Sequence, residues 1–369
     1  MRINVIVFEG GHPACGPERE MAAVRSAVTL DVLELCLSSG LFQKVILATN
    51  IPSLGAQARE LGAWVEETAD DGFHFGRALQ RVLQRHPCNG VVYLSGAGMP
   101  LLRRADLQEV VEHLRTGHVV VMNNPLSADL VAFSPTRTLS DIDLPATDNF
   151  LGYLLREAGL RRVLMTNTAR VNFDIDTPTD ILILALQAKV GARTAAATRS
   201  LAWDPAHLQR AAMVLTKPMA EVGLIGRVGA PIIAQINSHF SCRLRIYSEE
   251  RGMKALGREE RGEVRSLIGV LMERVGPRDL VRILSDLCDV VFMDTRVLFA
   301  HWKGQVSAKD RYYSDLGRWE LIEDEDIRAF TRAVVEAKIP FVLGGHSVVS
   351  GGLWLMVDDL IERGLGSRR

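Results

Sequence analysis

The sequence predicts an α/β protein of two successive domains, each built on a mostly parallel sheet covered by helices. Short apolar, often β-branched runs alternate with stretches of helical periodicity along most of the 369 residues. The runs are apolar throughout and do not alternate with polar residues. Strands of that kind belong to parallel sheets with helices on both faces. At ~100–200 residues per domain, the length favours two domains.

The first half of the chain has the most regular alternation. A strand at residues 2–8 ends at Glu9-Gly10-Gly11, and a helix follows from Pro17 to Gly40. Further strands are expected at 44–50, 64–67, 90–96, 118–124 and 162–167. Further helices are expected at 53–61, 75–85, 149–158 and 181–190, with another that starts at Asp106. We expect residues 1–192 to form the first domain.

Residues 191–203 have no clear apolar periodicity, so we expect a linker there. The second domain is then expected to span 204–369. Its strands are expected at 231–237, 242–248, 289–300 and 339–345. Its helices are expected at 261–274, 278–287, 325–337 and 352–363.

Composition and charge narrow the possible partners. The net charge is −1, from 43 basic and 44 acidic residues, so nothing favours nucleic acid as a partner. No run reaches the ~18 apolar residues of a membrane span. The five cysteines form no CxxC pair, which disfavours a zinc site or disulfide framework and fits the cytoplasm. The apolar stretch ILILALQAKV fits either a core or the interface of a homodimer.

One segment carries most of the functional information. Residues 173–180 read Phe-Asp-Ile-Asp-Thr-Pro-Thr-Asp and resemble the Asp-x-Asp-Thr-Pro-x-Asp segment of the molybdenum-cofactor and phospholactate guanylyltransferases. GLFQKVILATN, VVYLSGAGMPLL and NNPLSADLVAF resemble other segments of that family, in the same order. The resemblance covers about half of the chain. It implies a Rossmann-like nucleotidyltransferase sheet of the GT-A type in the first domain.

The resemblance also implies an activity. A nucleoside triphosphate would give its nucleotidyl group to a small phosphorylated or acidic acceptor, and pyrophosphate would leave. Such a reaction needs Mg²⁺ on the phosphates, held by one or two carboxylates. By resemblance, Asp176 is a metal ligand and catalytic residue, and Asp174 is the other metal candidate. The family has a further Asp where this chain has Gly98, directly before Met99.

Gly98 keeps a second interpretation open. Glycine offers no metal ligand, so the first domain could instead be a catalytically degenerate nucleotidyltransferase fold that acts as a binding or scaffold protein. The acidic segment also has a purely structural interpretation. Asp176 or Thr177 would cap a helix, with Pro178 as its first residue and Asp180 in its first turn.

The loop after the first strand is the expected phosphate-binding segment. Gly10 and Gly11 would let backbone N–H groups approach a phosphate, although a plain tight turn explains them equally well. Arg19 or Arg25 would supply positive charge, and Arg19 is also a catalytic candidate. Together with Gly98, these residues are the predicted nucleotide-binding set.

The second domain offers a further alternative, a phosphate- or metal-using enzyme. Gly344–Gly352 reads GGHSVVSGG and could bind an anion through its amides and Ser347, with His346 as a catalytic candidate. A glycine-rich turn between a strand and a helix is the other interpretation.

Two acids and an arginine complete this second set of candidates. Asp294 and Arg296 lie two apart on an expected strand and would share a face, either as a structural pair or as part of a site. In a site, Asp294 would join Asp315 and His346 around a metal or a substrate.

Overall fold

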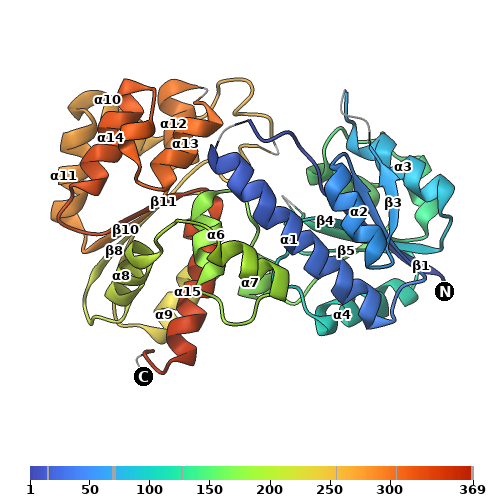
Figure 1. Cartoon of the computed structure of the whole chain (residues 1–369). Coiled ribbons are helices and arrows are strands. Elements are labelled where there is room, and N and C mark those ends of the chain that lie inside the picture. The colour runs from blue at the N-terminus through green and yellow to red at the C-terminus, as the bar shows by residue number, and fades with distance from the viewer. Residues whose placement is uncertain (15, 69–71, 126–127, 255, 305, 367–369) are drawn as a thin grey trace. The chain divides into compact units, whose positions relative to one another are not determined.

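The computed structural model describes residues 1–14, 16–68, 72–125, 128–254, 256–304 and 306–366 (Figure 1). Contacts group the chain into two compact units, each with its own sheet. The first unit comprises Met1–Pro13, Ala22–Asp174 and Lys189–Ala197, and the second comprises Ala14–Met21, Ile175–Ala188 and Thr198–Arg369. The predicted α/β class is confirmed. Grouping by contacts does not test which segments fold independently, so domains at 1–192 and 204–369 stay a prediction.

The first sheet has seven strands in the order β3-β2-β1-β4-β6-β5-β7. Strand β6 runs antiparallel to its neighbours β4 and β5, and the other pairs are parallel. The strands are β1 Ile3–Phe8, β2 Lys44–Thr49, β3 Trp64–Glu67, β4 Gly90–Ser95, β5 Val119–Met122, β6 Leu130–Ser134 and β7 Arg161–Leu164. Short apolar runs such as INVIVF form β1 because both of its faces are buried.

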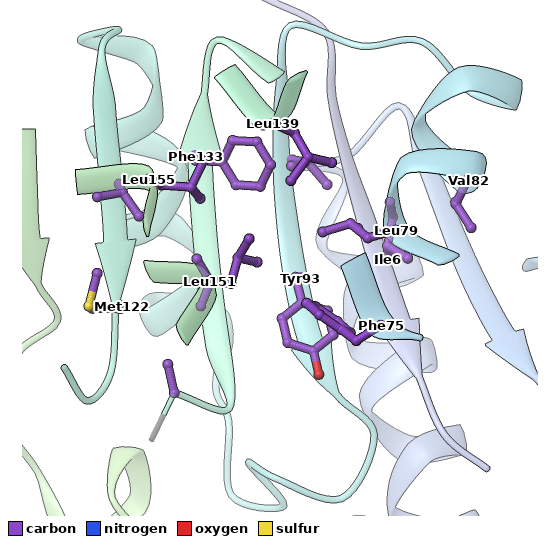
Figure 2. Packing of buried hydrophobic residues seen from close by; sticks show 14 of the residues in the cluster. Ile6, Phe75, Leu79, Val82, Tyr93, Met122, Phe133, Leu139, Leu151 and Leu155 are labelled. Atoms are coloured by element: carbon purple, nitrogen blue, oxygen red, sulfur yellow. The ribbon is translucent and has the colours of Figure 1, made fainter. Parts of the chain in front are cut away.

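Helices cover the first sheet on both faces. The α-helices are α1 Gly16–Ser39, α2 Pro52–Glu60, α3 Phe75–Arg85, α4 Arg104–Arg115 and α5 Leu151–Glu157, and the 3-10 helices are η1 Thr136–Asp141, η2 Asp148–Phe150 and η3 Ala169–Val171. Helices α3 and α5 contribute to one core cluster with alternate residues of β1, β4 and β6, shown in Figure 2. The rings of Phe75 and Tyr93 meet edge to face there, with centroids 4.8 Å apart. Helix α4 packs on β5 and β6 with residues outside that cluster.

The second sheet has four parallel strands in the order β11-β10-β8-β9. They are β8 Glu221–Gly226, β9 Arg243–Ser248, β10 Val290–Asp294 and β11 Phe341–Gly344. The α-helices after α5 are α6 Pro178–Ala185, α7 Ala192–Arg199, α8 Ala206–Leu215, α9 Ala230–His239, α10 Leu267–Val275, α11 Pro277–Leu287, α12 Thr295–Lys303, α13 Ala308–Asp315, α14 Glu325–Val335 and α15 Gly351–Glu362. The 3-10 helices are η4 Trp319–Leu321 and η5 His346–Val349.

One predicted strand of the second half is wrong, and another is shorter than predicted. Residues 231–237 lie in helix α9, which begins at Ala230 with Pro231 in its first turn and buries Ile232 and Ile236. A short apolar run is ambiguous, and the i, i+4 spacing of the two isoleucines fits a helix. The expected strand at 289–300 ends at Asp294, whose carboxylate accepts from the backbone N–H of Arg296 and starts α12.

The expected linker at 191–203 contains a helix, α7. Asp31 fixes the start of α7: its Oδ2 accepts from the Thr194 backbone N–H at 2.8 Å and from the Thr194 hydroxyl at 2.7 Å. A long-range side chain supplies this cap, so the local sequence gives no signal for it. Among the described residues, no helix is both long and apolar enough to cross a membrane.

Candidate functional site

The first sheet has a topological switch point between β1 and β4. Strand order runs outward from β1 through β2 to β3 on one side, and begins again at β4 on the other. Open α/β sheets bind ligands outside the carboxyl ends of the strands at such a point. Strand β1 is followed there by Glu9, and β4 by Gly96 and Gly98.

Glu9 is buried at this edge and is bonded to Arg25. The carboxylate of Glu9, 6% exposed, accepts from Arg25 Nε at 3.1 Å and from Nη2 at 3.2 Å. Its Oε2 lies 2.5 Å from the point that a Cβ on Gly96 would occupy, so only glycine fits at position 96. Arg25, a predicted nucleotide-binding residue, is thus an ion-pair partner of Glu9.

The loop with Gly10 and Gly11 is bonded to the end of β2. The Gly11 backbone N–H donates to Asn50 Oδ1 at 3.0 Å. Gly11 has φ +137°, a conformation that favours glycine, and a Cβ on Gly10 would stand 2.4 Å from Asn50 Oδ1. The backbone conformation at Gly11 and the close packing at Gly10 therefore explain why both residues are glycine. The N–H of Gly11 already has an acceptor.

An acid stands beside Gly98, although not at position 98. Gly98 is buried, and a Cβ built on it would lie 2.6 Å from both Cβ and Oδ1 of Asp129. Asp129 directly precedes β6. Because β6 is antiparallel to β4, its start lies at the edge where β4 ends. Asp129 thus brings a carboxylate to the place where the resemblance calls for one.

Asn123 holds the segment that carries Asp129. Its Oδ1 accepts from the backbone N–H groups of Asp129 at 3.0 Å and Leu130 at 3.1 Å, and its Nδ2 donates to the Val171 carbonyl at 3.0 Å. The Ser95 N–H donates to the Asp129 carbonyl at 2.8 Å. These bonds tie Asp129 to the end of β4.

Tyr93 reports on the charge at this edge. Its hydroxyl donates to Asp148 Oδ2 at 2.6 Å. Burial, followed by the charge of Asp148 and the more distant Asp129 and Glu9, holds the pKa of Tyr93 above its usual range. The carboxylates of Asp148, Asp129 and Glu9 therefore all act on this buried ring. No group of three or more His, Cys, Asp and Glu side chains in the described part of the chain is arranged to hold a metal.

The acidic segment at 173–180 is divided between the two units. Asp174 belongs to the first unit and Asp176 to the second. Thr177 and Asp180 form the capping box of α6, in which Asp180 Oδ2 accepts from the N–H groups of Asp176 and Thr177 and from the Thr177 hydroxyl at 2.8 Å. The segment has a structural role as a helix start, and Asp176 is exposed beside it.

The two threonines of this segment fit against the glycines of GGHSVVSGG. Thr179 Oγ1 donates to the Leu343 carbonyl at 2.6 Å. A Cβ on Gly344 would lie 3.3 Å from Thr179 Cβ, and one on Gly345 would lie 2.9 Å from Thr177 Cγ2. These glycines therefore permit close approach of α6 to the end of β11, in a turn that leads into η5.

Two buried ion pairs use the acids proposed for a second-domain site. Asp294 Oδ2 accepts from Arg227 Nε at 2.5 Å, at the β8–β10 switch point of the second sheet. Arg296 bonds both carboxylate oxygens of Asp315. The expectation that Asp294 and Arg296 share a face of one strand is wrong, because Arg296 lies in the first turn of α12.

His346 lies near the first of these pairs. Burial, and then the positive charge of Arg227, lower the pKa of His346 to about 4, so its ring is neutral at pH 7. Asp294 and Asp176 oppose this shift through their charges, which brings both acids and Arg227 into the same neighbourhood. Ser347 is buried, and its Oγ has no hydrogen-bond partner among the described residues. Arg19 also belongs to the second unit and donates from Nη2 to the Ala14 carbonyl at 3.3 Å.

Sequence reasoning missed Asp129, Asn123 and Arg227. Asp129 lies within NNPLSADLVAF, one of the segments that resemble the guanylyltransferase family. Its place beside Gly98 depends on the antiparallel direction of β6, which the local sequence does not reveal. Arg227 directly follows β8, a strand that was not predicted.

Comparison with known proteins gives likenesses of structure only. No protein-family model matches the chain, and no curated protein sequence matches it. Similar solved structures include a nucleotidyl transferase from Methanothermobacter, with 17% identity, a TM-score of 0.40, and 50% of this chain and 95% of that chain covered. A cytidylyltransferase from Leptospira borgpetersenii has 15% identity and a TM-score of 0.39, with 50% of this chain and 85% of that chain covered. A CMP:2-keto-3-deoxy-manno-octonic acid synthetase complexed with CTP has 14% identity and a TM-score of 0.38, with 55% of this chain and 100% of that chain covered.

Proposed function

We propose that the first unit binds a nucleoside triphosphate with a divalent cation at the β1–β4 switch point and transfers its nucleotidyl group. An oxygen of a small phosphorylated or acidic acceptor would attack the α-phosphorus. The bond from that phosphorus to the bridging oxygen would break, and pyrophosphate would leave with the electron pair. The protein's part in such a reaction is to position the anions and balance their charge.

The observation that carries the proposal is the carboxylate of Asp129 beside Gly98. The family that the sequence resembles has an aspartate at the position of Gly98, and Asp129 Oδ1 lies 2.6 Å from where a side chain at that position would begin. Asp129 is half-buried at the carboxyl edge of the sheet. An acid from β6 can therefore serve in place of one from β4.

The donor set fits Mg²⁺ bound mainly through substrate. Mg²⁺ commonly takes one or two protein carboxylates and completes its octahedron with phosphate oxygens and water. Asp129 is the carboxylate that would hold it, since it stands beside Gly98, where the resemblance calls for an acid. When bound, the cation would neutralise charge on the phosphates. Asp176 and Asp174 remain the metal candidates that the resemblance implies.

The test is a thermal-shift titration of the whole chain with ATP, GTP, CTP and UTP, each with and without Mg²⁺. A ligand at ~100 times its Kd adds about 2.7 kcal/mol to stability. We expect a Mg²⁺-dependent shift with one nucleotide, which Asp129→Asn removes. The matched control is Asp143→Asn, which changes an exposed carboxylate of the same unit and should keep the shift. Pyrophosphate release with a panel of sugar phosphates and small acids would then identify the acceptor.

A nucleotide-binding or scaffold protein without turnover is the second candidate. It is favoured by the bonds that already occupy the predicted phosphate loop, those of Gly11 to Asn50 and of Arg25 to Glu9. A nucleotide shift that needs no Mg²⁺ and survives Asp129→Asn would favour this candidate. No shift with any nucleotide would overturn both.

A further inference from the structure

A cavity of about 480 Å³ lies beside β11 within the second unit. Helices α8 and α13 pack against β11, the edge strand of its sheet. The cavity opens among these elements and the end of α14. Its volume falls in the range of ~300–1,000 Å³ typical of small-molecule sites. None of the residues discussed for nucleotidyl transfer lines it.

The floor of the cavity is apolar. Leu316, Val334, Ile339, Phe341 and Leu343 contribute to it. Backbone polarity is also present along β11. The Leu343 carbonyl accepts from Thr179, a residue of α6, whereas the Gly344 carbonyl accepts from Thr295, which follows β10. Along a β-strand, the backbone N–H and C=O groups of successive residues point alternately to the two sides of the strand. The peptide groups of odd-numbered β11 residues therefore face away from β10, and that of Leu343 is bonded to α6.

The rim of the cavity carries positive charge. Arg210 of α8 and Lys338 after α14 both line the cavity and are exposed, and neither has an ion pair among the described residues. His207 adds no charge at neutral pH, because burial and the nearby Arg210 lower its pKa. An unpaired arginine and lysine over an apolar floor suit a ligand with an anionic head.

The negative groups near the cavity do not cancel this charge. Asp315 lines the cavity, but both of its carboxylate oxygens are bonded to Arg296. The C-terminal turns of α13 and α14 add partial negative charges of roughly half an elementary charge each. These are smaller than the two full charges of Arg210 and Lys338 and are confined to the last turn of each helix.

We propose that this cavity binds a small organic anion with an apolar body, whose carboxylate, phosphate or sulfonate head contacts Arg210 and Lys338. The body would lie on Phe341 and its apolar neighbours. The site is independent of nucleotidyl transfer in the first unit. It gives the second unit a ligand of its own.

The test uses two fluorescent probes on the full-length chain. Anilinonaphthalenesulfonate has an aromatic body with an anionic head, and phenylnaphthylamine has nearly the same body without the charge. We expect saturable binding of one anionic probe per folded chain. Arg210→Gln with Lys338→Gln should weaken it by about tenfold or more, the loss expected for charge-assisted contacts. Binding of the neutral probe should stay within about twofold, since such a change is a small free energy.

Two further variants make the result decisive. Lys217→Gln with Arg282→Gln removes two exposed cations of the same unit that do not line the cavity, and should change neither probe. Ala337→Trp fills the cavity and should remove both probes. Unchanged binding of the anionic probe in the Arg210–Lys338 variant, or equal weakening of both probes, would overturn the proposal. The nucleotide titration of that variant should match the original chain, so failure here is distinguishable from failure of the proposed function.

Discussion

The Cβ and Oδ1 of Asp129 each lie 2.6 Å from the point where a Cβ on Gly98 would stand. Side chains at positions 98 and 129 would therefore occupy the same space, so only one of the two positions can carry a side chain. Gly98→Asp alone should destabilise the chain by about 1–3 kcal/mol through overpacking, and should place two carboxylates together. Chemical denaturation measures the loss.

Moving the carboxylate from position 129 to position 98 tests whether its location alone is enough for stability and nucleotide binding. The double variant with Gly98→Asp and Asp129→Gly transfers the carboxylate to the segment that follows β4 and removes the clash, so it should recover both stability and the Mg²⁺-dependent nucleotide shift. Asp129→Ala in the same background is the matched control. It keeps a Cβ 2.6 Å from the new one, so the clash should persist. Equal stability of the two double variants would contradict the geometry.

Asn123 positions Asp129 through the backbone rather than by touching a ligand. Asn123→Ala removes the acceptor of two N–H groups and should cost about 1–3 kcal/mol. We expect the Mg²⁺–nucleotide affinity to fall while nucleotide binding without metal is unchanged. Asn123→Asp keeps the acceptor but loses the donor to Val171, and should recover most of the affinity. If both variants weaken binding equally with and without metal, Asn123 has no specific role in placing Asp129.

The alternation of apolar runs predicted six of the seven strands of the first sheet, all but β6 at Leu130–Ser134. Its buried strands are continuous apolar segments, and burial on both faces leaves little ambiguity about them. The secondary structure of the second unit was harder to predict, because PIIAQIN fits a strand by composition and a helix by the spacing of Ile232 and Ile236. Asp294 ends a strand and starts a helix with one side chain, which the continuous apolar run around it conceals.

The candidate site was predictable only in part, for a topological reason. The sequence located the glycine loop after β1 and the empty position at Gly98. It could not reveal that Asp129 fills that position, since this follows from the reversed direction of β6. The acidic segment at 173–180 was recognised from local residues, yet Thr177 and Thr179 pack against Gly345 and Gly344 more than 160 residues later. Such partners are set by the fold.

Arg227 and Asp294 form a buried ion pair, and removing the cation alone should cost more stability than removing both charges. Burial would raise the pKa of Asp294, but Arg227 outweighs it and holds that pKa below its usual value. Arg227→Met should cost about 3–5 kcal/mol, because it leaves a buried carboxylate without its cation. Adding Asp294→Asn should restore part of the loss, since the amide still accepts from the Arg296 N–H. Additive losses in a double-mutant cycle would show that the two side chains are not coupled.

The contact between Gly345 and Thr177 gives a rescue experiment. Gly345 has an ordinary φ of −89°, so a side chain there is opposed by packing alone. Gly345→Ala should cost about 1–3 kcal/mol, because its Cβ would lie 2.9 Å from Thr177 Cγ2. Thr177→Ser removes that methyl group and keeps the hydroxyl that bonds Asp180. The double variant should therefore melt close to Thr177→Ser alone, and a loss that persists would contradict the packing.

Asp180 and His346 make opposite contributions to the pH dependence of stability in the second unit. Burial, and then the charge of Asp176, raise the pKa of Asp180 from 3.8 to about 7. The folded state therefore binds the extra proton, and this contribution to stability is lost as pH rises between about 4 and 7. His346, whose pKa falls from 6.5 to about 4, contributes stability that grows as pH rises through about 4 to 6.5. The two slopes offset each other in the original chain.

Asp180→Asn separates the two contributions. The amide oxygen can accept the bonds from Asp176 and Thr177, and the amide nitrogen can donate to Ser347, whose hydroxyl lacks a partner among the described residues. At pH 4 the variant should match the original chain, because Asp180 is protonated there. At pH 8 it should be more stable by at least about 1 kcal/mol, since no buried carboxylate is ionised. Urea denaturation at both pH values measures the difference, and a variant no more stable than the original chain at pH 8 would show that Asp180 is not the group that titrates.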